Sequence, residues 1–219
     1  MILNGSRLFS AMIIVFIGWQ WGQAGWIITK AQLAQWLIAE AWEQALETKS
    51  DSESAHKPWR WADTWPIARL QAPAHKVDLY VLEGDRGNAL AFGPGRNQSS
   101  RLPGEGTSVI GGHRDTHFRF LKDIKLGEPL RVQTRSGKWL DYNIQERTII
   151  DVNQDPLRVN LNDQQLVLVT CYPFDTLTSG GPLRLVVYAS LNKPEITNLS
   201  LHEDQLFSQY TESSPAMAF

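Results

Sequence analysis

The sequence predicts an all-β domain that follows an apolar N-terminal helix. From Ile67 onward, short runs rich in aliphatic and β-branched residues alternate with turn residues, and this spacing is typical of a closed or nearly closed sheet. Ahead of this region lie an uncharged apolar run, a stretch with helical periodicity and a polar connection. We therefore expect one globular β domain with a helical segment in front of it.

The N-terminal apolar run has the features of a membrane anchor. It follows Arg7, contains no charged residue and is as long as the roughly 20 residues that a helix needs to cross a bilayer. Trp19, Trp21 and Trp26 crowd its far half, as in the aromatic belt at a membrane interface. We therefore expect an uncleaved transmembrane signal anchor over residues 1–29, with the amino terminus inside the cell and the following chain outside.

Three further segments follow the anchor. Residues 31–47 have apolar side chains at near-helical spacing, and residues 49–56 are polar. We expect residues 30–56 to form a helical stalk and linker that stands off the membrane or lies on its surface. The globular domain then covers residues 57–191, and a polar tail covers residues 192–219.

Seven strands are predicted within the globular domain. Each is a short aliphatic or β-branched run that turn residues end. Ser136-Gly137 marks a tight hairpin, and residues 88–92 and 116–121 have the pattern of single helical turns. The expected strands cover residues 67–71, 77–82, 107–111, 129–134, 138–151, 166–171 and 183–191.

The composition limits the possible partners. The 219-residue chain is 42% hydrophobic and 20% charged, with a net charge of −2. A chain without excess positive charge is not expected to bind a polyanion, so nucleic acid is excluded as a partner. Cys171 is the only cysteine, so no disulfide can form within the chain.

Cys171 is the main candidate for chemistry. It lies in the run Leu-Val-Leu-Val-Thr-Cys-Tyr-Pro-Phe, where a strand leads up to Thr170-Cys171 and Pro173 prevents its regular continuation. A thiol at the end of a rigid strand is held in place and remains reachable. Because lone cysteines are more often small buried hydrophobes, a nucleophile also needs a base and an anion-stabilising group from elsewhere in the chain.

Two other strand ends supply those groups. His113 follows the apolar strand that leads into Gly111-Gly112, and Arg184 begins the aliphatic run of the last strand. An isolated histidine or arginine in such a place is more often structural. A cysteine, a histidine and an arginine at three strand ends are together typical of a catalytic site.

These motifs resemble those of the sortases, and most closely the Gram-negative class of these cysteine transpeptidases. The resemblance implies an eight-stranded sortase-type β-barrel with short helices, one strand more than the pattern predicts. The missing strand is expected within residues 138–151 or near residues 93–101. In the family signature Thr-Leu-x-Thr-Cys, Val167 replaces the first threonine. The matching motifs are KPWRWADTWP (57–66), LEG (82–84), LAFGPG (90–95), GHRDTHF (112–118), VTCYPF (169–174) and GGPLR (180–184).

The resemblance also implies a role for each candidate residue. Cys171 would attack a peptide carbonyl as a thiolate, Arg184 would stabilise the oxyanion, and His113 would donate a proton to the departing amine. Asp115 and Thr170 are candidates for supporting roles beside them. The spacing of His113 and His117 does not predict a zinc site, because no second cysteine exists, and we expect neither a metal nor a cofactor.

By resemblance, the protein is a membrane-anchored transpeptidase on the periplasmic side of the inner membrane. Its partners would be a secreted protein with a C-terminal Leu-Pro-x-Thr-Gly-like sorting signal, which Cys171 would hold as a thioester, and an acceptor amine. Two alternatives remain open. One is a non-enzymatic, membrane-tethered β-barrel binding module. The other is a cysteine L,D-transpeptidase-like enzyme, although the run Thr170-Cys171-Tyr172-Pro173 does not match its Ser-x-Gly-Cys-x-Arg-like motif.

Overall fold

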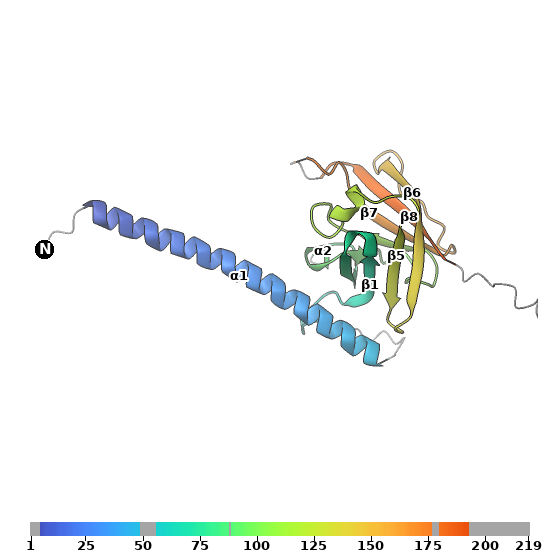
Figure 1. Ribbon diagram of the computed structural model, residues 1–219, viewed down its shortest axis with the longest axis horizontal. Coiled ribbons are helices and arrows are strands. Elements are labelled where there is room, and N and C mark those ends of the chain that lie inside the picture. Colours follow the sequence, from blue (N-terminus) through green and yellow to red (C-terminus); the bar gives the residue numbers. More distant parts are fainter. Residues whose placement is uncertain (1–4, 49–55, 88, 177–179, 193–219) are drawn as a thin grey trace, which may run out of the picture.

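The globular domain is a closed β-barrel, and the C-terminal part of a long helix lies beside it (Figure 1). The computed structural model describes residues 5–48, 56–87, 89–176 and 180–192. The barrel order is β1-β2-β3-β4-β7-β8-β6-β5. Its strands are β1 (Pro66–Ala72), β2 (Val77–Glu83), β3 (Gly95–Arg96), β4 (Ser108–Gly111), β5 (Pro129–Thr134), β6 (Trp139–Asp151), β7 (Gln165–Cys171) and β8 (Leu183–Leu191); the helices are α1 (Gly5–Thr48), α2 (Ala89–Phe92) and the 3-10 turns η1 (Pro73–His75) and η2 (Arg119–Lys122).

The eight-stranded barrel confirms the expected fold class, and the seven strands predicted from the pattern lie within one residue of their predicted ends. The eighth strand is β3, which lies in the second of the two expected regions. It has only two residues, pairing in parallel with β2 and in antiparallel with β4. Two residues cannot show a period of two, so no sequence pattern could indicate this strand.

The core lies inside the barrel and fixes the face that each strand turns inward. On β7, Leu166 and Leu168 are fully buried within this core. Side chains alternate between the two faces of a strand, so Val167, Val169 and Cys171 belong to the opposite face. The strand therefore carries core residues on one face and Cys171 at the end of the other.

Helix α1 is continuous across the boundary between the expected anchor and stalk. Its C-terminal part packs against the domain beside β1, β2 and α2 (Figure 1). Ile38 and Trp42 are buried there, the ring of Trp42 lies 6.4 Å from that of Tyr80, and Gln35 donates a 2.7 Å hydrogen bond to the carbonyl of Phe92. Part of the expected helical stalk therefore covers one side of the domain.

The described residues contain no helix that is both long enough and apolar enough to cross a membrane. The transmembrane span predicted for residues 1–29 is therefore not supported. Helix α1 has the length, but Gln20, Gln23 and three glycines interrupt the apolar run in its far half.

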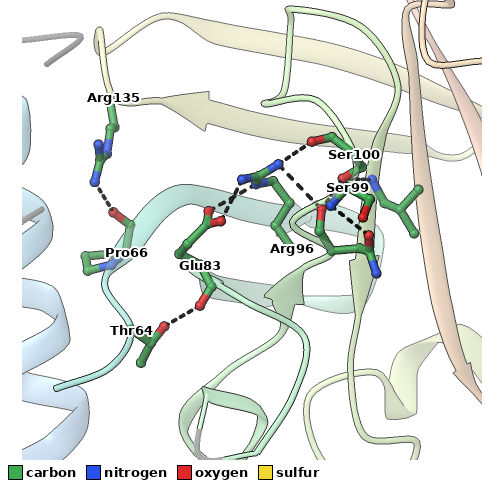
Figure 2. A network of polar contacts seen from close by, with 9 residues as sticks. Thr64, Pro66, Glu83, Arg96, Ser99, Ser100 and Arg135 are labelled. Atoms are coloured by element: carbon green, nitrogen blue, oxygen red, sulfur yellow. Dashed lines mark hydrogen bonds and ion pairs between the residues drawn. The ribbon is translucent and has the colours of Figure 1, made fainter. Parts of the chain in front are cut away.

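A buried ion pair joins the short strand β3 to β2 (Figure 2). Nη2 and Nε of Arg96 donate to the two carboxylate oxygens of Glu83 at 2.6 and 3.1 Å, and the two side chains are only 12% and 9% exposed. Arg96 also donates to the carbonyl of Ser100, whose hydroxyl accepts a 3.1 Å hydrogen bond from the backbone of Val109 in β4. Side chains therefore reinforce the barrel where its strands are shortest.

The structure also explains Gly95 in β3. A side chain at this position would collide with the carbonyl oxygen of Gly84. Only glycine allows the backbone of β3 to approach the end of β2 this closely.

We expect Arg96→Met to lower the free energy of unfolding by about 3–5 kcal/mol, because it leaves the buried Glu83 carboxylate without its partner. Urea denaturation measures this loss. The matched control is Arg69→Met, which breaks the more exposed pair with Asp78 (side chains 31% and 43% exposed) and should cost about 1 kcal/mol or less. Equal losses in the two variants would show that the buried pair does not hold β3 in place.

Candidate active site

Cys171 and Arg184 face each other across two neighbouring strands. Cys171 is the last residue of β7, and the antiparallel register pairs it with Arg184 near the start of β8. The backbone N–H of Tyr172 donates to the carbonyl of Leu183, so these two residues, next to Cys171 and Arg184, form a hydrogen-bonded pair of the antiparallel ladder. Cys171 and Arg184 are then a non-hydrogen-bonded pair, in which the Cα atoms lie only about 4.5 Å apart and the side chains share one face.

His113 follows β4, which is the neighbour of β7 on the side opposite β8. Strands β4 and β7 are parallel, and Gly111 is the register partner of Val169. His113 is exposed and lies two residues beyond Gly111, and Cys171 lies two residues beyond Val169. The N–H of Gly112 donates to the carbonyl of Val169 at 3.1 Å, so the chain still runs beside β7 at this point.

Thr170 fixes the strand exit that carries His113. Its side chain is buried, and its hydroxyl donates a 2.7 Å hydrogen bond to the carbonyl of Gly112. This bond joins the residue before Cys171 to the residue before His113. Thr170 therefore links the two strand ends directly, and its supporting role in catalysis stays a prediction.

Arg184 is oriented by the loop in front of β8. Its Nη1 donates to the carbonyls of Gly181 and Leu183 at 2.6 and 2.8 Å. Within the described part of the chain, no hydrogen bond is made by its Nε or Nη2. These two nitrogens are the donors that a substrate oxyanion could use, since a guanidinium remains charged at every working pH.

Asp115 is a candidate for a supporting role beside His113. Among the described residues, no hydrogen bond joins the two side chains. Asp115 is exposed, and its charge raises the pKa of His117, opposing two larger effects. Burial lowers the pKa of His117 most, followed by the charge of His113. Residue type alone did not indicate that His117 is half-buried, with an Nδ1 that has no hydrogen-bond partner among the described residues.

Gly112 makes room for the turn that follows His113. A Cβ at this position would lie 2.7 Å from the ring of Phe118, which is fully buried in the core. Phe118 also donates a 2.9 Å backbone hydrogen bond to the carbonyl of His113. The glycine therefore allows a core residue to pack directly beneath the strand exit.

The loop after Cys171 is attached to the segment after His113, a feature that the sequence did not indicate. Arg114 donates to the carbonyls of Pro173 and Thr176. Lys122 forms a 2.8 Å ion pair with Asp175.

Among the described residues, no three His, Cys, Asp or Glu side chains gather closely enough to hold a metal ion.

Comparisons with known proteins agree on one family. The model of the Sortase domain matches residues 70–192. Sortase D of Bacillus subtilis (strain 168) is 31% identical over 156 residues, which cover 69% of this chain and 78% of that protein.

Solved sortase structures share the fold. Sortase A from Corynebacterium diphtheriae superposes with a TM-score of 0.52 at 27% identity, covering 65% of this chain and 67% of that one. The Sortase D5 transpeptidase of Clostridium perfringens has a TM-score of 0.57 at 22% identity, covering 72% and 99%. The barrel, the domain match and these relatives together show that the chain belongs to the sortase family of cysteine transpeptidases.

Proposed function

We propose that this chain cleaves a Leu-Pro-x-Thr-Gly-like sorting signal at the C-terminus of a secreted protein and transfers the product to an amine. The observation that supports the proposal is the strand register, which pairs Cys171 on β7 with Arg184 on β8, while β4, the other neighbour of β7, ends two residues before His113. A non-enzymatic binding module would not need a thiol, an imidazole and a guanidinium in one row.

The first half of the reaction forms a thioester. The thiolate of Cys171 attacks the carbonyl carbon of the substrate threonine, and Arg184 donates to the resulting oxyanion. When the tetrahedral intermediate collapses, the carbon–nitrogen bond breaks, and the departing amine takes a proton from the His113 imidazolium. The acyl group remains on the Cys171 sulfur.

The second half reverses these roles. An acceptor amine attacks the thioester carbonyl and gives up a proton to the neutral His113 imidazole. The carbon–sulfur bond breaks, a new amide forms, and the Cys171 thiolate and the imidazolium are restored. Water in place of the amine gives hydrolysis, so the balance between transfer and hydrolysis depends on which nucleophile enters the site.

We further propose that the chain is a Gram-negative-class sortase that works on the periplasmic side of the inner membrane. The support for the class is the set of sequence motifs, including residues 57–66. Support for membrane attachment comes from the N-terminal half of α1, which exposes a series of large apolar side chains that water solvates poorly. These are Phe9, Met12, Ile13, Ile14, Val15, Phe16, Ile17, Trp19, Trp21 and Trp26.

Incubation with a Leu-Pro-x-Thr-Gly peptide should add the mass of the acyl fragment to the protein, because the thioester forms before the acceptor arrives. Intact-mass spectrometry detects this adduct, and added hydroxylamine should release it. The Cys171→Ala variant should remain unmodified. If wild type and Cys171→Ala both stay unmodified with every sorting-signal peptide tried, the transpeptidase proposal is wrong.

Removal of the two cationic partners should slow acylation while Cys171 remains in place. We expect His113→Ala to lower kcat by about 10²–10⁴-fold through the lost proton donor. Arg184→Ala should lower it by about 10²–10³-fold through the lost oxyanion donor. Chromatography of the released peptide over time measures the rate of acylation for each variant.

The control for these two variants is Arg131→Ala. Arg131 lies on β5 and pairs with the exposed Asp141 at 2.9 Å, away from β4, β7 and β8. Its kcat should stay near that of the wild type. A similar fall in all three variants would indicate a general loss of structure instead of two catalytic roles.

A further inference from the structure

Arg114, which follows His113 in the sequence, holds the loop that follows Cys171. Its Nη1 donates to the carbonyl of Pro173 at 2.7 Å, and its Nη2 donates to the carbonyl of Thr176 at 3.1 Å. The two planar N–H groups of one guanidinium thus bind two backbone carbonyls at once, which a lysine ammonium at the end of a flexible stem does less well.

These bonds complete a set of contacts on both sides of the candidate nucleophile. Before Cys171, Thr170 donates to the carbonyl of Gly112. After Cys171, Arg114 binds the carbonyls of Pro173 and Thr176. His113 lies between Gly112 and Arg114, so the same two segments are joined directly before and directly after the His113–Cys171 pair.

The other link to this loop is weaker. Lys122 and Asp175 form an ion pair, but their side chains are 48% and 81% exposed, and exposed pairs contribute little. Tyr172 and Phe174 pack against the core with their rings 6.4 Å apart, so the loop also has apolar contacts of its own. Loss of Arg114 should therefore change the position of the loop without unfolding the domain.

We propose that Arg114 is a positioning residue for acyl transfer. By holding the loop 172–176 against the segment that carries His113, it sets the placement of the imidazole relative to the Cys171 sulfur. This inference rests on the proposed function. A displacement of about 1 Å between reacting groups can cost about 10²-fold in rate, so two hydrogen bonds that fix this spacing affect the chemistry more than the stability.

The test is a double-mutant cycle in the full chain with Arg114→Met and His113→Ala. In an otherwise wild-type protein, Arg114→Met should lower kcat for peptide cleavage by about 10-fold or more, with KM changed much less. In the His113→Ala background, the same substitution should have little further effect, because the group that Arg114 positions is absent.

Two matched variants separate positioning from loss of structure. Arg114→Lys keeps the positive charge and a single donor nitrogen, and it should recover part of the lost rate. Lys122→Met removes the other link to the loop and should leave kcat within about 2-fold of the wild type, since exposed pairs contribute little. Thermal melting should give similar transitions for all these variants.

The rate of Cys171 alkylation by iodoacetamide provides the same cycle without any peptide. Arg114→Met should slow alkylation in the presence of His113 and leave it unchanged in the His113→Ala background. Additive effects of the two substitutions, or an Arg114→Met rate equal to that of the wild type, would overturn the positioning role. Failure of the wild type to react with any peptide would instead refute the proposed function, and the alkylation cycle would still decide the role of Arg114.

Discussion

The register of β7 between β4 and β8 is the constraint on which the site depends. Backbone hydrogen bonds fix this strand on both sides, in parallel with β4 and in antiparallel with β8. A slip of one residue would turn Cys171 toward the inside of the barrel and move Leu166 and Leu168 out of the core to the opposite face of the strand. The burial of those leucines therefore stabilises the one register in which the thiol is reachable, and packing and chemistry select the same arrangement.

At the ends of the strands, glycines and side-chain hydrogen bonds provide close contacts and links that regular backbone pairing does not provide. At the strand exits, Gly112 leaves room for Phe118, and the Thr170 hydroxyl continues the link between β4 and β7 beyond the last regular pair. On the neighbouring strands β2 and β3, the Glu83–Arg96 pair supports a strand of two residues. At both positions, a polar side chain forms a hydrogen bond to the backbone or to a buried partner at the point where the backbone hydrogen bonds between the strands end.

The sequence predicted the features that depend on local pattern. Long alternating runs located seven strands, and the strand ends identified Cys171, His113 and Arg184 as candidates. It could not predict features that arise from contacts between distant segments. β3 is too short to show periodicity, the burial of His117 depends on how the chain turns after β4, and the partners of Arg114 are backbone carbonyls, which leave no trace in residue type.

The continuous helix α1 has a consequence for the direction in which the barrel faces. Ile38 and Trp42 fasten the end of the helix to the domain, and the same helix continues back to Gly5. Each residue of an α-helix advances the chain by about 100° around its axis, since a turn holds 3.6 residues. The helix therefore acts as a rigid connection between its N-terminal end and the barrel. Adding or removing one residue within the helix would rotate the barrel about the helix axis by more than a quarter turn relative to the N-terminal end of α1. A flexible linker of equal length would not transmit this rotation.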